Sequence, residues 1–552
     1  MNVDHYLAQI PLYNSGRLTD ELSQKLFILR NEQFNGIISD ICNPETRDKH
    51  QLIVGRPGMG KSSLLKRVEV ELRGNKKYNS LYIPLLFSSE HYNLKSKKDI
   101  WNNALVSLCE YIEEFSETES APSEKSGSFD VLSDFSTASG KKIILLLDNI
   151  DMIEYKCGEN ELIEFLSEVQ KSDRIHIVAT TSPENEQSGF FPHFNVKYLG
   201  KPTFEEYIKI LLNLSTVTRY PNVASEIKSN VSYIMSLYIL SGGSPRSATI
   251  IFKSIVRGFP EDVFDLLNNL LDELSPKYRG IFDSLSNQMQ VILDAIGLNW
   301  APITIEQLRN ATGYENQQLS PQLKRLVDMG IIEKIDAYMA KGGAYQFYDR
   351  LFNLWLITNS HNRLERNKVI YLSRFLENFY KDRIPESVRK NLDIQSTHLN
   401  RITEQLEFVK SLKEQNRLRK EENASFSPSY SINAAASEIN SYWLQKTLSQ
   451  LSQDNLGMAG ESLGKALADI SSGFQSYEKE DWWRFTRIVL GLGRADWLLK
   501  IMKRNNIDTT LSPYYVAVES YTATDPEKFF NSVAVEIKDT ARELRSIFSF
   551  SA

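Results

Sequence analysis

A glycine-rich loop that ends in lysine and serine is the clearest chemical feature of the sequence. Gly55–Ser62 reads GRPGMGKS and fits the phosphate-loop pattern G-x-x-x-x-G-K-[ST]. Glycines let the backbone approach phosphates and point its N–H groups inward. We expect Lys61 to contact the β- and γ-phosphates of ATP and the Ser62 hydroxyl to bind Mg²⁺. The predicted ATP-binding residues of this segment are Gly55, Pro57, Gly58, Met59, Gly60, Lys61, Ser62 and Ser63.

The segments on either side of this loop supply the context that the motif requires. Gln51–Val54 is an apolar run of strand length, and Ser63–Arg73 has the spacing of an amphipathic helix. The N-terminus of such a helix favours bound anions through its dipole. A chance match in a glycine turn is the alternative, and the strand–loop–helix order argues against it.

A second nucleotide signal is the apolar strand within Lys141–Asp151, KKIILLLDNID, which ends at Asp148. In a parallel sheet this end lies at the edge that carries the phosphate loop, where a carboxylate can hold Mg²⁺ or its waters. We therefore predict that Ser62 and Asp148 form a metal site. The alternative for Asp148 is a helix N-cap, a position that aspartate favours.

The residues that follow Asp148 bear on hydrolysis. An ATPase needs a group that orients or deprotonates the attacking water. The amide of Asn149 can orient water but cannot accept its proton at neutral pH, and Asp151 is the candidate to do so instead. The sequence thus predicts ATP binding with slow hydrolysis, and Lys61, Asp148, Asn149 and Asp151 are candidate catalytic residues.

Two further segments can reach the nucleotide. The strand IVATTSP ends in hydroxyls, of which Thr181 is the first and Thr180 the second candidate to sense the γ-phosphate. A strand end that caps the next turn explains these hydroxyls equally well. In the segment GGSPR, Pro245 could contact the adenine and Arg246 the phosphates, although composition alone favours a plain interhelical turn with a surface arginine.

The order of predicted elements indicates an α/β fold, with the parallel sheet of P-loop NTPases, a helical lid, a winged-helix domain and an all-α C-terminal region. The runs 142–147 and 175–180 are continuously apolar, as expected of central strands buried on both faces. The Ser- and Glu-rich segment 116–140 predicts a mobile loop or insertion. The predicted strands span 51–54, 80–87, 142–147, 175–180 and 196–199.

The winged helix is predicted from three helices at 285–298, 304–311 and 316–329, followed by two short strands around a wing at 341–344. The polar stretch 412–431 is predicted to be a linker between helical segments. The predicted domains are an N-terminal extension with an adenine-side box (1–50), the P-loop α/β domain (51–202), the helical lid (203–280), the winged helix (281–360) and a helical C-terminal sensor or partner domain (361–552).

Composition sets broad limits on the class of protein. The chain has 552 residues and a net charge of −6, which argues against bulk attraction to nucleic acid or anionic lipid. Its three cysteines form no C-x-x-C pair, so neither a zinc site nor a disulfide framework is predicted. The N-terminus lacks the regions of a signal peptide, and no apolar run approaches the ~18 residues of a membrane helix. We expect a cytoplasmic protein with no membrane partner.

These motifs, in this order, resemble the STAND class of signalling ATPases, which are relatives of the AAA+ proteins and of archaeal origin-recognition initiators. The resemblance covers residues 20–360. FILRNEQF resembles the F-x-G-R-E-x-E-L box, with Leu29 in place of the glycine, and implies adenine-side contacts by Phe27 and Arg30. GGSPR resembles the G-x-P motif of the helical lid, which supports Pro245 and Arg246 as nucleotide-binding residues.

The sequence also departs from the family pattern at two positions. Asn149 stands where an acidic residue is common, which argues for slow hydrolysis. Ser182 stands where many relatives have an arginine, which weakens the sensor role of Thr181. Prokaryotic members often act as sensors in antiphage defence or as regulators, with C-terminal helices that recognise a trigger. The resemblance implies an ATP–Mg²⁺ switch whose C-terminal helices bind a protein partner or self-associate.

The alternative function is a DNA-acting AAA+ initiator or transposition-type regulator that uses the winged helix. DNA recognition would involve Lys324 and Arg325, but residues 281–349 carry five positive and eight negative side chains, a net charge of −3. Such a domain is a poor electrostatic partner for DNA, so DNA is not the favoured partner. A scaffold that keeps its nucleotide permanently bound is a third interpretation. Further cations that could contact DNA are Arg417, Arg419 and Lys420 in the predicted linker.

Overall fold

The computed structural model of the chain divides into two compact units. The first unit comprises Met1–Val223 and Gly243–Arg257, and the second comprises Ala224–Gly242 and Gly258–Ala552. The residues that the structure describes are 10, 18–43, 50–87, 94–115, 122, 127–183, 188–218, 220, 223–258, 262–336, 343–360, 363–381, 388, 439–470 and 479–549.

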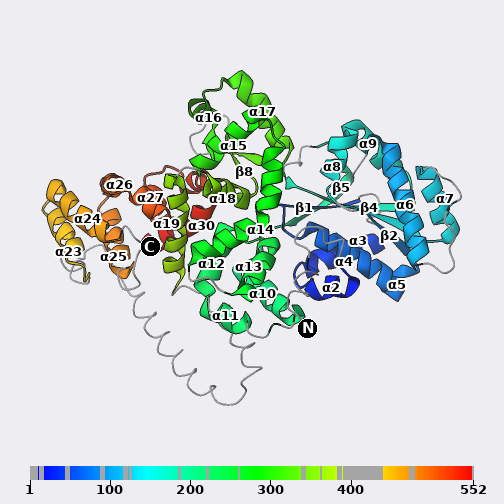
Figure 1. Cartoon of the computed structure of the whole chain (residues 1–552), viewed down its shortest axis with the longest axis horizontal. Coiled ribbons are helices and arrows are strands. Elements are labelled where there is room, and N and C mark those ends of the chain that lie inside the picture. Colours follow the sequence, from blue (N-terminus) through cyan, green and yellow to red (C-terminus); the bar gives the residue numbers. More distant parts are fainter. Residues whose placement is uncertain are drawn as a thin grey trace, which may run out of the picture. The chain divides into compact units, whose positions relative to one another are not determined.

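The first unit is built around a five-stranded parallel sheet (Figure 1), which confirms the predicted fold class. The strand order is β2-β3-β4-β1-β5, so β1 lies next to β4, and β4 separates it from β3. The inner strands are apolar and almost completely buried, as continuous Ile, Leu and Val runs require. The strands are β1 (His50–Gly55), β2 (Tyr82–Phe87), β3 (Lys142–Leu147), β4 (Ile175–Thr181) and β5 (Phe194–Leu199).

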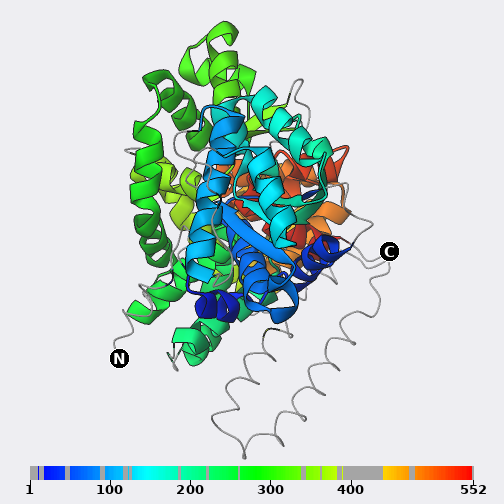
Figure 2. The same cartoon turned by 90° about the vertical axis from the view of Figure 1, so that its right-hand side faces the viewer.

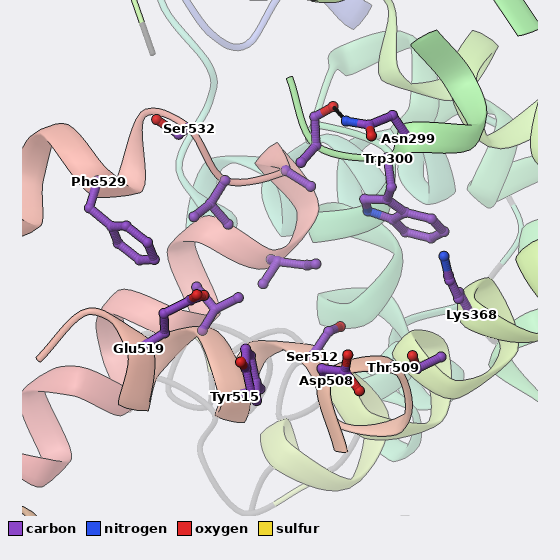
Figure 3. A pocket seen from close by; sticks show the side chains of 15 residues that line it. Asn299, Trp300, Lys368, Asp508, Thr509, Ser512, Tyr515, Glu519, Phe529 and Ser532 are labelled. Carbon is purple, nitrogen blue, oxygen red and sulfur yellow. Dashed lines mark hydrogen bonds between the residues drawn. The ribbon is translucent and has the colours of Figure 1, made fainter. Parts of the chain in front are cut away.

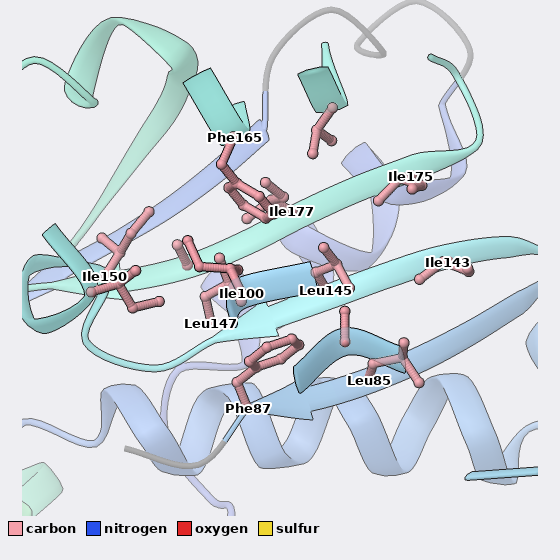
Figure 4. Close-up of a cluster of buried hydrophobic side chains, with 14 of the residues drawn as sticks. Leu85, Phe87, Ile100, Ile143, Leu145, Leu147, Ile150, Phe165, Ile175 and Ile177 are labelled. Atoms are coloured by element: carbon pink, nitrogen blue, oxygen red, sulfur yellow. The ribbon is translucent and has the colours of Figure 1, made fainter. Parts of the chain in front are cut away.

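Helices cover both faces of this sheet. One core joins the sheet to α3 and α4, and the other joins it to α6, α7, α8 and α9, where side chains such as Phe165 and Ile100 meet Leu145 and Ile177 (Figure 4). Figure 2 turns the molecule so that the blue and cyan helices of this unit face the viewer. The helical elements are α2 (Asp20–Leu26), α3 (Asn31–Cys42), α4 (Lys61–Gly74), α5 (Lys76–Asn79), α6 (Lys97–Phe115), α7 (Phe129–Ser139), α8 (Ile150–Cys157), α9 (Glu159–Val169) and the 3₁₀ turn Phe191–His193.

Helix α7 corrects one sequence prediction. The segment 116–140 was expected to be a loop or insertion, and this was wrong for Phe129–Ser139. The Ser128 hydroxyl accepts the N–H of Val131 at 3.3 Å and caps the helix. Leu132 is fully buried in the sheet core, and the Ser136 hydroxyl donates to the Lys141 carbonyl at 2.5 Å. The serines therefore cap and anchor a helix, although their abundance suggested a loop.

The segment predicted to be the helical lid is divided between the two units. Helices α10 (Phe204–Thr218) and α13 (Pro245–Arg257) belong to the first unit, whereas α12 (Val231–Leu240) and α14 (Val263–Asp283) belong to the second. Helix α11 spans Val223–Ser229. Within the first unit, the Tyr207 hydroxyl of α10 lies 3.0 Å from the Ser247 hydroxyl of α13, so these two helices are joined in the core.

The second unit contains the elements from which the winged helix was predicted. A capping box starts α16, in which the Thr304 hydroxyl accepts the N–H of Gln307 at 3.2 Å. Of the predicted wing at 341–344, residues 341 and 342 lie outside the described residues. The elements are α15 (Asn287–Asn299), β6 (Ile303–Thr304), α16 (Ile305–Thr312), α17 (Asn316–Asp328), β7 (Ile332–Ile335) and β8 (Ala344–Phe347), with the antiparallel strand order β6-β8-β7.

The rest of the second unit is helical, as expected of the C-terminal region. A buried ion pair joins helix α18 to helix α30. The Arg350 guanidinium of α18 donates to both carboxylate oxygens of Glu536 in α30, at 2.7 and 2.6 Å. The predicted linker with Arg417, Arg419 and Lys420 lies outside the described residues. The helices are α18 (Arg350–Asn359), α19 (Arg363–Tyr380), α23 (Tyr442–Ser452), α24 (Leu456–Ile470), α25 (Lys479–Gly491), α26 (Ala495–Arg504), α27 (Ile507–Thr510), α28 (Ser512–Glu519), α29 (Pro526–Phe530) and α30 (Val535–Phe548).

Candidate nucleotide-binding site

The glycine-rich loop joins a buried strand to a helix. Strand β1 ends at Gly55 and helix α4 begins at Lys61. Gly58 and Gly60 have φ angles of 80° and 92°, in the left-handed region that favours glycine. Gly60 is the N-cap of α4, and no side chain among the described residues caps this helix. The first N–H groups of α4 are therefore the natural donors for an anion at the loop.

Lys61 places a positive charge at this loop. Its side chain is buried, and its Nζ donates to the carbonyl oxygen of Gly55 and, at 3.4 Å, to that of Arg56. Both acceptors are oxygens of the loop itself, so the ammonium group lies where the loop would receive a phosphate. A compact ammonium charge on a flexible stem suits phosphate oxygens.

Asp148, at the end of β3, lies beside the loop as the sequence predicted. Its carboxylate accepts the Ser62 hydroxyl at 2.6 Å through one oxygen and the Thr180 hydroxyl at 2.7 Å through the other. The side chain is only 4% exposed. The N-cap of the following helix is Asn149, so the alternative in which Asp148 caps that helix is wrong. The two predicted metal ligands, Ser62 and Asp148, are therefore in direct contact.

The next residues form a second set of contacts at the same sheet edge. Asn149 has a φ angle of 56°, and its N–H donates to the Thr180 hydroxyl at 2.8 Å. The Thr181 hydroxyl donates to the Asp151 carboxylate at 3.1 Å. Burial raises the pKa of Asp151, against the lowering effect of the Thr181 hydrogen bond and of the Lys61 charge. A carboxylate with a raised pKa is a better proton acceptor near neutral pH.

The N-terminus of α13 approaches the loop from a distant part of the chain. The N–H of Arg246 donates to the Gly58 carbonyl at 3.4 Å. A Cβ atom at Gly58 would lie 3.3 Å from the Arg246 Cβ and 3.4 Å from the Ser244 Oγ, which is tighter than most such contacts. Pro245 is the first residue of the helix. The N-terminus of α13 thus brings Arg246 next to the backbone of the phosphate loop.

Arg30 lies at the end of strand β5, and Phe27 packs against helix α3; neither belongs to the loop. Arg30 has a φ angle of 68°, and its guanidinium donates to the carbonyl oxygen of Gly200. Gly200 follows Leu199, which pairs with Gly55 in the sheet, so Arg30 lies at the edge that carries the loop. The Arg30 Nε is buried and has no hydrogen-bond partner within the described ranges. The Phe27 ring packs edge-on against Phe34, with centroids 5.7 Å apart.

The structure adds Ser244 to the predicted set and separates the roles of the two predicted threonines. Thr180, the second candidate, contacts the Asp148 carboxylate, whereas the first candidate, Thr181, contacts Asp151. Ser244 lies against Gly58, and its hydroxyl also accepts the N–H of Ser247 at 3.1 Å. The strand-end position of both threonines was visible in the sequence, but only their side-chain directions decide which carboxylate each one contacts.

A parallel sheet, a glycine loop ahead of a helix and a serine–aspartate contact beside it define a P-loop NTPase-type nucleotide-binding domain. Residues 50–209 match the family described as NACHT domain. The predicted resemblance to STAND-class P-loop ATPases is confirmed for this segment. No curated protein matches the sequence.

The chain also matches solved structures at low sequence identity. The Walker-type ATPase PABY2304 of Pyrococcus abyssi is 14% identical, with a TM-score of 0.43, and the match covers 60% of this chain and 96% of that one. The Orc1 protein of Aeropyrum pernix, in complex with DNA, is 13% identical, with a TM-score of 0.35, over 61% and 92% of the two chains. The RuvB Holliday junction branch migration motor of Thermotoga maritima is 15% identical, with a TM-score of 0.29, over 55% and 90%.

The described residues hold neither of two other features, a cluster of metal-binding side chains or a membrane-spanning helix. Within the described residues, no group of three or more His, Cys, Asp or Glu side chains is arranged to hold a metal ion. The predicted Mg²⁺ site differs in kind, because it uses a hydroxyl and one carboxylate, and the nucleotide itself would supply further oxygens. In the same part of the chain, no helix is both long and apolar enough to cross a membrane.

Proposed function

We propose that this protein is an ATP- and Mg²⁺-dependent switch of the STAND type that hydrolyses ATP slowly. The contact between Ser62 and Asp148 at the end of the phosphate loop supports this proposal most strongly. Hydroxyl and carboxylate oxygens are the ligands that Mg²⁺ prefers. When bound, Mg²⁺ would neutralise charge on the β- and γ-phosphates. Ser62 and Asp148 would hold it, directly or through water.

The other predicted residues have distinct proposed tasks. Lys61 and Arg246 orient the phosphates from the two helix N-termini that meet at Gly58. On the adenine side, the buried and unpartnered Nε of the half-buried Arg30 is a donor for a nucleotide acceptor, and Phe27 offers an aromatic edge. Pro245 is the proposed adenine contact from the lid.

Hydrolysis is proposed to be slow because Asp151, the next acidic residue after Asp148, is already hydrogen-bonded. Asn149 orients water without accepting its proton. Asp151 can accept that proton, but its carboxylate is partly buried and accepts the Thr181 hydroxyl. Thr181 therefore occupies part of the acceptor capacity that an attacking water would use.

Helix α13 is the proposed switch element. It contacts the loop through Arg246, and the chain leaves the first unit on both sides of it, between Gly242 and Gly243 and between Arg257 and Gly258. The three glycines at these crossings all have positive φ angles, from 65° to 114°. Such positions can absorb backbone rotation when a neighbouring element moves. A nucleotide that binds one arrangement of α13 more tightly would shift the population toward it.

The proposed output is partner binding or self-association through the C-terminal helices. A role as a cytoplasmic sensor in antiphage defence is proposed from the family resemblance. The DNA-acting alternative remains less favoured, because the charge of residues 281–349 is −3. A salt-dependent gel shift tests it: binding at low salt, lost at high salt, would favour the initiator over the switch.

Nucleotide titration of the wild type and of Lys61→Ala tests the proposed function. We expect the wild type to retain ATP and to change particle size between ATP and ADP, whereas Lys61→Ala should do neither. Lys171→Ala, at an exposed lysine in the turn after α9, is the matched control and should behave as the wild type. Particle size and nucleotide content that are indifferent to Lys61 would contradict the switch.

A further inference from the structure

A cavity of about 360 Å³ lies within the second unit, away from the phosphate loop in the sequence (Figure 3). Its walls come from the end of α15 and the residues that follow it, from α19, and from the C-terminal helices α27 to α30. Cavities of this size hold small molecules or single side chains of a partner. Val516, Phe529 and Ile537 form an apolar wall that can cover an alkyl stem.

Two carboxylates line the same cavity. Asp508 lies on α27 and Glu519 at the end of α28. Neither carboxylate makes a hydrogen bond or ion pair with any residue that the structure describes. Burial raises the pKa of Glu519; the charge of Lys503 opposes this shift and that of Asp508 adds to it. Burial and these two carboxylates also raise the pKa of Tyr515 to about 12. Two lining carboxylates that form no ion pair within the described residues favour a positively charged ligand.

Trp300 supplies an independent sign of a ligand. It is 7% exposed, and its indole Nε1 has no hydrogen-bond acceptor among the described residues. Figure 3 shows the nitrogen on the side of the ring that faces the other lining residues. A buried donor without a partner is costly, and an acceptor oxygen on a ligand would satisfy it.

The backbone of Trp300 is strained and held in place. Its φ angle is 63°, which is a clear outlier for a bulky residue. Its N–H donates to the Gly297 carbonyl at 3.1 Å, and its carbonyl accepts the Arg350 guanidinium at 3.3 Å. Arg350 is itself fixed by the buried ion pair with Glu536. Strain of this kind gathers at binding sites, where the surroundings hold it.

Lys368 of α19 completes the polar rim beside Trp300. Figure 3 shows its side chain pointing toward the indole, on the opposite side of the cavity from Glu519 and Tyr515. Its Nζ also pairs with Glu365 at 2.8 Å. The cavity is therefore lined by two donors, Trp300 and Lys368, and by two carboxylates, of which Glu519 lies opposite the donors (Figure 3). This combination matches a ligand that has both an acceptor oxygen and a cation.

We propose that this cavity binds a guanidinium or ammonium group on an apolar stem that also carries an acceptor oxygen, which is the chemistry of arginine and lysine. Asp508 and Glu519 take the cation, Trp300 donates to the oxygen, and the apolar wall contacts the stem. Two sources share this chemistry: a free basic amino acid and a basic residue of a polypeptide. The site lies outside the unit that holds the phosphate loop and does not rest on the proposed nucleotide switch.

Calorimetric titration of the full chain tests the proposal. The probes are L-arginine, L-lysine, the peptide mimic Nα-acetyl-arginine amide, and L-leucine as an uncharged control. We expect the basic probes to bind and leucine not to bind. Tighter binding of the free amino acids would identify a metabolite, and tighter binding of the amide would identify a polypeptide side chain. Both outcomes support the site.

Variants locate the binding. Asp508→Asn and Glu519→Gln should each weaken it by about tenfold or more, because each removes a charge-assisted hydrogen bond. Asp496→Asn, at an exposed carboxylate on α26, is the matched control and should bind normally. Lys61→Ala should also bind normally, which separates this site from the nucleotide site.

A measurement on the wild type avoids dependence on the folding of the variants. Arginine should slow hydrogen exchange in α27, α28 and the start of α30. The proposal is overturned if no basic probe binds at millimolar concentration, if leucine binds equally well, or if bound arginine protects other segments only.

Discussion

Replacement of Asp148 by asparagine should remove the Mg²⁺-dependent part of ATP binding. Asparagine keeps the size of the side chain and one acceptor oxygen but loses the charge. In the structure the carboxylate accepts the hydroxyls of Ser62 and Thr180 at 2.6 and 2.7 Å and is 4% exposed. Hydrogen bonds to a charged group contribute about 1.5–3 kcal/mol each, so the loss of one such ligand interaction should raise the Kd for ATP–Mg²⁺ roughly 10- to 150-fold.

The assay is an equilibrium titration with a fluorescent ATP analogue, in excess Mg²⁺ and again in EDTA. The informative quantity is the ratio of the two Kd values within each variant, because it cancels any general effect of the substitution on the fold. Wild type should show a large ratio and Asp148→Asn a ratio near one. Asp134→Asn, at an exposed carboxylate on α7, should match the wild type. An unchanged ratio in Asp148→Asn would refute the assignment of this carboxylate to the metal.

Three other predictions concern catalysis and stability. Asp151→Asn should lower kcat for ATP by about 10²–10⁴-fold with little change in Kd, and the wild-type rate should rise with pH through the raised pKa of Asp151, because only the ionised form accepts a proton. Equal pH–rate profiles for both proteins would exclude that role. Burial lowers the pKa of His50 to about 3 and of His176 to about 4, so the unfolded chain binds protons that the folded chain excludes. The free energy of unfolding should therefore fall as pH falls from about 6.5 toward these values, by up to about 1.4 kcal/mol per pH unit for each histidine, and denaturant titrations of His176→Phe should show a smaller fall. Arg350→Met should cost about 3–5 kcal/mol of stability, because it leaves the Glu536 carboxylate buried without its partner. An unfolding midpoint equal to that of the wild type would contradict this.

The phosphate loop and the sheet could be predicted because each is encoded in a continuous run of sequence. Gly55–Ser62 lies directly between an apolar strand and an amphipathic helix, so local pattern and local structure coincide. Asp148 follows an uninterrupted apolar run, and the edge on which a parallel strand ends fixes where its carboxylate lies. The local sequence was therefore sufficient to predict where the phosphate loop and the Asp148 carboxylate lie.

Contacts between distant segments could not be predicted in this way. Nothing in the local sequence shows that Arg246 approaches Gly58, or that Thr180 rather than Thr181 contacts Asp148. Helix α7 was missed because serines that cap and anchor a helix have the composition of a loop. The carbonyl of Trp300, whose φ angle is positive, accepts the guanidinium of Arg350, which is distant in the sequence. In each case the deciding interaction is tertiary.

The most direct test of the central claim is an experimental density map of the full chain with Mg²⁺ and a non-hydrolysable ATP analogue. We predict the triphosphate on the backbone N–H groups at the start of α4, with Lys61 on its terminal phosphates and the metal between Ser62 and Asp148. A triphosphate bound elsewhere, or a metal that neither of these two residues contacts, would contradict the account.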